Sequence, residues 1–167
     1  MDHMTILVKN KHTLLIDEFK FRCCIGKNST TINKKEGDKK TPRGIFEIEN
    51  LYFRKDRIKK PQTSLKCIEI KESMGWCDDI CYPKKYNKLI KVDKNLKHEK
   101  LKRKDYKYDL LIPVKYNFKK PVVGKGSCIF IHLTKNYNPT AGCIALKEKD
   151  FLILLKLIKK KTKIKIL

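Results

Sequence analysis

The sequence is divided into short apolar runs by loops rich in Lys, Asn, Gly and Pro, and this pattern restricts the fold more than any other feature. Apolar runs of about four to eight residues bounded by turn-forming residues are typical of strands. In the run 19–25, apolar residues alternate with Lys20 and Arg22, as expected for a strand with one buried face. The pattern therefore predicts a mainly β fold. The predicted strands are 6–9, 13–16, 19–25, 45–52, 65–70, 108–114 and 128–133.

The apolar period changes near the C-terminus, from two residues to about 3.6. Glu148 and Asp150 stand near the start of this segment and lysines 159–161 close it, an arrangement that complements a helix dipole. The apolar residues that share one helical stripe are Phe151, Leu154, Leu155 and Ile158. Residues 163–167 alternate again and predict a terminal strand. The expected fold class is therefore all-β in the main, with a short C-terminal helix.

The length of 167 residues, without an internal repeat or a second-domain boundary, predicts a single domain over 1–167. Residues 1–3 resemble an expression scar, with Met4 as a natural start. No stretch of about 18 apolar residues occurs, so no membrane span is expected. The N-terminus lacks a basic leader followed by an apolar segment. Localisation therefore stays open: periplasm or cell envelope if an export signal has been removed, and cytoplasm otherwise.

The net charge of +23, from 41 basic and 18 acidic residues, suggests attraction to polyanions. Only five of the basic residues are Arg, and the Lys are scattered among Ile and Asn in every segment. This mixture is typical of an AT-rich genome and favours a solvated lysine coat over a specific nucleic-acid site. The seven cysteines lack the spacing of a zinc site, so we expect no metal, and one disulfide among them stays open.

The segment 128–146 carries the residues best suited to catalysis. If 128–133 is a strand, Cys128, Phe130 and His132 share one face, and the loop that follows returns the chain to Gly142 and Cys143. An imidazole beside a thiol can take its proton, which a neutral thiol with a pKa near 8.5 needs in order to attack. Gly142 permits close approach of a substrate backbone, and the N–H groups near it are candidates for an oxyanion site.

Two separated segments resemble signatures of L,D-transpeptidases (the YkuD domain). The first is 37–46, Gly-Asp-Lys-Lys-Thr-Pro-Arg-Gly-Ile-Phe, and the second is His132 with 139–146, Pro-Thr-Ala-Gly-Cys-Ile-Ala-Leu. Residues 75–79 and 108–110 resemble further segments of a bacterial branch. The resemblance implies a β-sandwich of mixed sheets, with Cys143 as the nucleophile, His132 as the base, and thioester adducts with carbapenems. It also implies peptidoglycan stem peptides as the partner and no cofactor.

The second segment departs from the better-known family motif, Ser/Thr-His-Gly-Cys followed by a polar residue such as Arg, and then Asn. Here Ala141 replaces the His and Ile144 replaces the polar residue. In members that have this second His it is not the base, so the dyad is retained. The contacts that anchor the peptide and set donor specificity do not carry over.

Five further residues are candidates for substrate binding, and four of them also have a structural alternative. Thr41 either walls the cleft or forms a turn, and Thr140 orients the loop through its hydroxyl. Trp76 either lines a peptide groove or fills the core. Asp78 and Asp79 either hold the ammonium group of a diaminopimelate side chain or form a turn and pair with lysines.

Three functions are consistent with the sequence. The preferred one is a cysteine L,D-transpeptidase that forms crosslinks through an acyl-enzyme, with a monomer favoured. The second is a hydrolytic carboxypeptidase or amidase acting on cell-wall peptides. The third is a non-catalytic basic module that binds anionic glycan or nucleic acid, which the charge alone supports.

Overall fold

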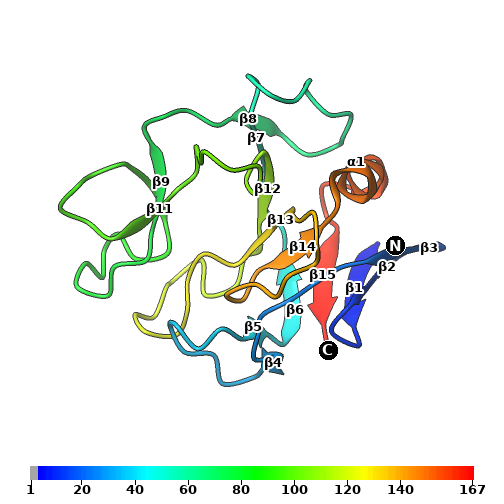
Figure 1. Ribbon diagram of the computed structural model, residues 1–167. Coiled ribbons are helices and arrows are strands. Elements are labelled where there is room, and N and C mark those ends of the chain that lie inside the picture. The colour runs from blue at the N-terminus through cyan, green and yellow to red at the C-terminus, as the bar shows by residue number, and fades with distance from the viewer. Residues whose placement is uncertain (1–3) are drawn as a thin grey trace.

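The computed structural model describes residues 4–167 (Figure 1), so residues 1–3, the suggested expression scar, lie outside the described part. The described residues form two five-stranded sheets, two smaller sheets and one helix. The mainly β class with mixed sheets and a short helix is confirmed.

The first sheet joins the two ends of the chain. Its N-terminal strand β1 pairs in parallel with the last strand β15, while the other neighbours are antiparallel. In order across the sheet, the strands are β3 (Phe19–Arg22), β2 (Thr13–Ile16), β1 (Thr5–Lys9), β15 (Lys163–Ile166) and β6 (Gly44–Glu47). The alternation of buried and exposed residues in β15 shows that this sheet buries one face.

The second sheet is buried on both faces. Its strands, in order, are β14 (Ile144–Leu146), β13 (Phe130–Leu133), β12 (Leu110–Pro113), β7 (Leu51–Phe53) and β8 (Cys67–Glu69). One face, including Ile112 and Ile131, packs on the first sheet. The other face, including Leu111 and Phe130, belongs to a second apolar cluster around Trp76. The predicted division of the 128–133 segment into two faces is therefore confirmed from Ile129 to Leu133.

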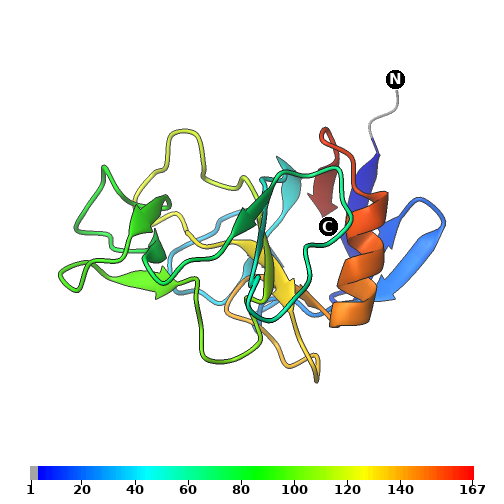
Figure 2. The same cartoon turned by 90° about the horizontal axis from the view of Figure 1, so that it is seen from above.

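The second cluster packs under a small lobe that lies apart from the main sandwich, at the left of Figure 1. The lobe is a three-stranded antiparallel sheet of β10 (Leu89–Lys91), β9 (Met74–Cys77) and β11 (His98–Lys100). Figure 2 shows the lobe and the sandwich as separate parts of one elongated molecule. A fourth sheet pairs β4 (Thr30–Thr31) with β5 (Thr41–Pro42) in parallel.

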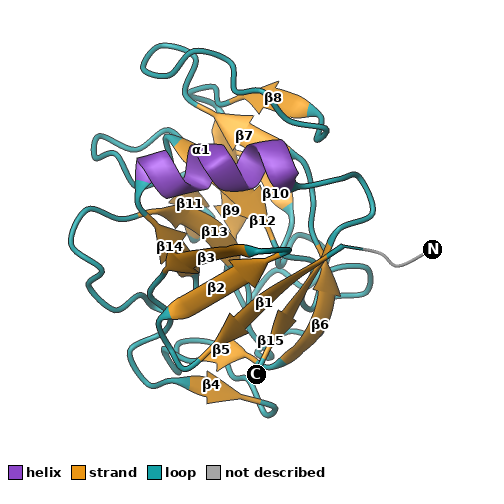
Figure 3. Cartoon of the chain, turned by 90° about the vertical axis from the view of Figure 1, so that its right-hand side faces the viewer, coloured by secondary structure: helices purple, strands orange, loops and turns teal. Residues whose placement is uncertain are grey.

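Helix α1 (Glu148–Leu157) lies along one side of the molecule (Figure 3). Phe151, Leu154 and Leu155 face the main core as predicted, and Ile158 is buried at the C-terminal cap. Lysines 159–161 follow the helix rather than belonging to it. Among residues 4–167, no helix is long and apolar enough to cross a membrane.

Several predicted boundaries are wrong. The 19–25 strand ends at Arg22, because Cys24 leaves the first sheet and pairs with Ala145 of the second. The 45–52 run is split between two sheets, and the 128–133 strand begins at Phe130, since Cys128 has a left-handed φ of 54° that a strand does not tolerate. Strands β4, β5, β9, β10, β11 and β14 were not predicted.

Candidate active site

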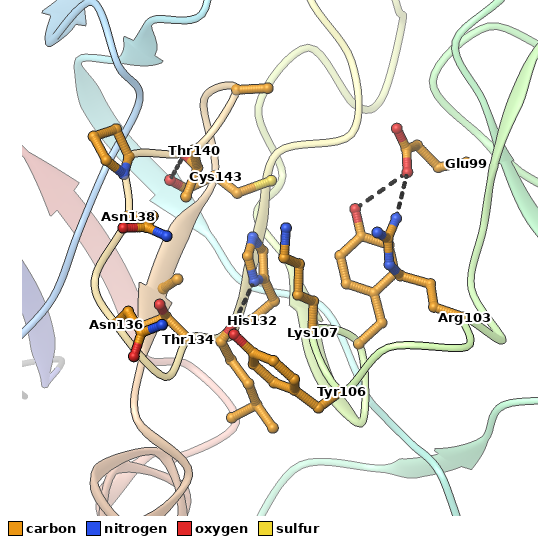
Figure 4. A pocket seen from close by; sticks show the side chains of 15 residues that line it. Glu99, Arg103, Tyr106, Lys107, His132, Thr134, Asn136, Asn138, Thr140 and Cys143 are labelled. Atoms are coloured by element: carbon orange, nitrogen blue, oxygen red, sulfur yellow. Dashed lines mark hydrogen bonds and ion pairs between the residues drawn. The ribbon is translucent and has the colours of Figure 1, made fainter.

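Parallel pairing of β13 with β14 brings the predicted nucleophile and base together. In this register His132 lies opposite Ala145, so Cys143, just before β14, lies beside the first half of β13. The side chains of Cys143 and His132 both face the cavity in Figure 4. The loop between β13 and β14 is long enough to bring Cys143 back toward His132, and the parallel pairing of the two strands holds it there.

The Cys143 thiol is held by the backbone of the neighbouring strand. Its Sγ donates to the Cys128 carbonyl at 3.1 Å and accepts the Phe130 N–H at 3.3 Å. Cys143 is only 9 % exposed, and burial raises the pKa of its thiol to about 12. The resting group is therefore a neutral thiol, and it needs a base in order to attack.

His132 offers such a base. Its Nδ1 lies 2.9 Å from the Leu133 carbonyl, which has no proton to donate, so Nδ1 carries the hydrogen and Nε2 has the free lone pair. Burial, together with the positive charges of Lys107 and Arg103, lowers the pKa of His132 to about 4. The ring also contacts the edge of Tyr108, with 5.5 Å between centroids. The imidazole is thus neutral and fixed in the tautomer that accepts a proton at Nε2.

The loop before Cys143 is fastened at two points. The Thr140 hydroxyl donates to the Cys143 carbonyl at 2.6 Å and accepts the Gly142 N–H at 3.1 Å. The Thr41 hydroxyl donates to the Gly142 carbonyl at 2.8 Å and accepts the Gly26 N–H at 2.9 Å. Thr41, in the first signature, therefore contacts the second signature through a hydrogen bond.

Two glycines make this close approach feasible. A Cβ on Gly26 would lie 2.5 Å from the Lys39 carbonyl oxygen, and a Cβ on Gly142 would lie 2.8 Å from that of Lys40. Gly142 also has a φ of +142°, which residues with side chains rarely adopt. The segment before β5 and the loop before Cys143 therefore touch backbone to backbone.

A cavity of about 270 Å³ opens onto the Cys143 and His132 side chains. Its polar wall comes from two segments, the chain between β11 and β12 and the loop between β13 and β14 (Figure 4). The lining residues are Glu99, Arg103, Tyr106, Lys107, Tyr108, His132, Leu133, Thr134, Asn136, Asn138, Pro139, Thr140, Ala141, Cys143 and Ala145. Ala141 stands in place of the second family His, so the loop between β13 and β14 brings no imidazole to the cavity.

The other predicted binding residues do not line this cavity. Thr41 is fully buried beneath the Cys143 loop. Trp76 is 3 % exposed and donates to Asn87, so it fills the second cluster. Asp79 accepts N–H groups from Cys81 and Lys97, which is a turn-forming role, and Asp78 pairs with Lys97 at 3.5 Å.

Sequence reasoning missed the wall contributed by residues 99–107. The Lys-rich composition of this segment did not indicate a site, because similar lysines occur throughout the sequence. The only signal was its position just before 108–110, a segment already noted for its family resemblance. All seven cysteines lie within residues 4–167 and carry free thiols, and that part of the chain holds no group of His, Cys, Asp and Glu that could bind a metal ion.

Comparison with known proteins agrees with this geometry. The L,D-transpeptidase catalytic domain family, YkuD, matches residues 2–166, and the chain therefore belongs to this family, whose members act on peptidoglycan. A search of curated proteins finds none that matches.

Two solved structures are similar to the chain. The helical cell shape determining protein Pgp2 from Campylobacter jejuni has a TM-score of 0.53 and 19% identity, covering 98% of this chain and 47% of its own. Bd1075 from Bdellovibrio bacteriovorus has a TM-score of 0.49 and 16% identity, covering 99% of this chain and 48% of its own. The chain thus spans about half the length of each protein, and the likeness to Pgp2 supports the fold.

Proposed function

We propose that this chain is a single catalytic domain that cleaves peptidoglycan stem peptides through a thioester on Cys143 and transfers the acyl group to a second stem peptide. The observation that carries the proposal is that Cys143 and His132 line one cavity, while the Leu133 carbonyl holds Nδ1 of His132 and so leaves Nε2 to accept a proton. Membership of the YkuD family supports the substrate class.

The first half-reaction transfers the acyl group to sulfur. The substrate carbonyl belongs to an L-centre joined to a terminal D-residue. Because thiol and imidazole are both neutral at rest, the thiol proton passes to His132 Nε2 as Cys143 Sγ adds to the carbonyl carbon. The imidazolium then protonates the leaving nitrogen, the C–N bond breaks, and the thioester remains.

The second half-reaction reverses these roles. An amine of another stem peptide adds to the thioester carbonyl while Nε2 takes its proton, and the C–S bond breaks with return of the proton to sulfur. Backbone N–H groups near Gly142 and Cys143 are proposed to face the oxyanion. The Gly142 N–H donates to Thr140 at rest, so its contribution requires that bond to open.

Hydrolysis differs from crosslinking only in the acceptor, since water replaces the amine. A defined disaccharide tetrapeptide substrate separates the outcomes by mass spectrometry. Crosslinking releases the terminal D-residue and forms a dimer, whereas a carboxypeptidase releases the same residue and leaves a tripeptide. A non-catalytic basic module gives neither product.

The test of the covalent step is intact-mass analysis after incubation with a carbapenem. We expect one thioester adduct on the natural chain, loss of the adduct in Cys143→Ala, and retention in Cys128→Ala, the matched control for a neighbouring thiol. An adduct that survives Cys143→Ala would disprove the assignment of the nucleophile.

A further inference from the structure

Lys107 is a cation held beside the predicted base. Its carbonyl accepts the Leu133 N–H at 2.9 Å, so its backbone is tied to the residue that follows His132. Its own N–H donates to Asp105 Oδ1 at 3.1 Å, which fixes the chain on the other side. The Lys107 side chain lines the cavity, and Figure 4 shows it extending alongside the His132 ring.

The neighbouring cation, Arg103, is already neutralised. Its Nε and Nη2 donate to the two oxygens of Asp105 at 2.8 and 2.7 Å, and its Nη1 lies 3.6 Å from Glu99. Within residues 4–167, in contrast, Lys107 Nζ has no hydrogen bond or ion pair to another side chain. Lys107 therefore supplies the cavity with a positive charge that is available to a ligand.

The position of Lys107 beside His132 indicates which substrate group it meets. In the proposed reaction His132 protonates the nitrogen of the leaving residue, so that nitrogen must lie at the imidazole. The leaving residue is one amino acid long, and its carboxylate carbon is two bonds from that nitrogen. An anion therefore arrives next to His132, within a few ångströms of the transferred proton.

From this juxtaposition we propose that Lys107 binds the free C-terminal carboxylate of the leaving residue and so restricts the enzyme to peptides with an uncapped end. This inference rests on the proposed function. A charged pair in a partly enclosed cavity adds binding energy that an amide-capped or already crosslinked end does not receive. The lysine would thus distinguish free stem ends from stems that are linked through the same carboxyl group.

The test compares a tetrapeptide that ends in a carboxylate with the same peptide ending in a carboxamide. For the natural chain we expect kcat/KM to be about 10- to 100-fold higher for the acid, mostly through KM. Lys107→Met lowers kcat/KM for the acid to the level of the amide without a further loss on the amide. Lys107→Arg restores most of the preference.

Lys135→Met is the matched control, because Lys135 lies over the Tyr106 ring at 4.4 Å and does not line the cavity. This variant retains the preference. A third peptide, with a free C-terminus but an amidated side-chain carboxylate on the diamino acid, identifies the source of the anion. If the preference follows the side-chain carboxylate, or if Lys107→Met keeps the preference for the acid, the proposal is wrong.

A binding measurement separates this proposal from the proposed function. Titration of the Cys143→Ala variant with the two peptides requires no turnover. Tighter binding of the acid, abolished by Lys107→Met in the same background, supports carboxylate recognition even if the natural chain shows no acyl transfer. Equal binding of acid and amide overturns it even if acyl transfer occurs.

Discussion

At the scale of single residues, burial controls the protonation of both candidate catalytic groups. It raises the pKa of Cys143 and lowers the pKa of His132, so each is neutral across the physiological range. A preformed thiolate–imidazolium pair is therefore not the resting state. In the proposed mechanism, the thiol must leave the Cys128 carbonyl, with which it is hydrogen-bonded, and turn toward Nε2.

Replacement of His132 by Gln tests its role as the base. At pH 7 we expect acylation to slow by about 10² to 10⁴, the usual contribution of a positioned base. Because the pKa of Cys143 is about 12, the variant should regain rate steadily as pH rises to 10, without a plateau. Acylation rates against pH, with folding checked by circular dichroism, provide the measurement. An unchanged rate at pH 7 would remove His132 from the mechanism.

The pKa of His132 also predicts how stability depends on pH. In the unfolded chain a His takes up a proton near pH 6.5, whereas folded His132 does so only near pH 4. Between these values the unfolded state binds more protons, so acidification from pH 7 to 4.5 destabilises the fold, through this residue, by roughly 2 to 3 kcal/mol. Urea unfolding at both pH values should show a smaller loss for His132→Gln than for the natural chain. Equal losses would contradict the assigned protonation state.

At the scale of elements, the site depends on the docking of residues 26–42 against the loop before Cys143. Residues 24–27 run beside 140–145 through backbone hydrogen bonds, including Lys27 N–H to the Thr140 carbonyl at 2.9 Å. Thr41 then connects Gly26 to Gly142 through its hydroxyl. The first family signature thus serves as the support of the second, although it contributes no lining residue to the cavity.

Thr41→Val tests this support because Val keeps the shape of Thr without its hydroxyl. The Gly26 N–H and the Gly142 carbonyl would lose their shared partner in a buried place, which should lower the free energy of unfolding by about 2 kcal/mol. The Cys143 loop should also shift, and acylation should slow in a folded protein. Thr41→Ser is the matched control, since it retains the hydroxyl and should retain the acylation rate. Equal rates for the Val and Ser variants would show that the hydrogen bond does not position Cys143.

At the scale of the whole molecule, the second sheet separates two apolar clusters and the candidate site lies at its edge. Cys143 and Phe130 belong to the cluster under the lobe, whereas Ile129 and Ile131 belong to the main core. The whole chain carries a net charge of +23. Most of the ion pairs involve side chains that are at least partly exposed, as expected of a solvated coat.

The charge predicts different salt responses for a polymer and for a small substrate. Charges spread over a solvated surface act through a field that salt screens beyond roughly 8 to 10 Å. Binding to intact anionic cell-wall sacculi should therefore weaken steeply as salt rises, whereas turnover of a soluble stem peptide should change much less. Sedimentation assays and peptide kinetics across one salt series provide the comparison. Equal salt sensitivity would indicate that the surface charge acts inside the catalytic cavity instead.

The sequence alone determined the family, the mainly β class and the two residues that the site brings together. Those inferences rest on local information: the two-residue alternation of strands, the 3.6-residue stripe of the helix, and two motifs of short span. The same local information misplaced several ends, because an apolar run such as 45–52 does not reveal that it changes sheets halfway.

The tertiary structure alone decided how the segments meet. Short lobe strands such as β9 and β11 form because they pair with each other. Trp76 is a core residue because it belongs to the second apolar cluster. Thr41 contacts Gly142 across 101 positions of sequence, and Lys107 stands beside His132 because its carbonyl pairs with the Leu133 N–H. Contacts between distant segments produce no periodic pattern in the sequence. The pattern of apolar residues in a strand is the same whichever segment the strand pairs with.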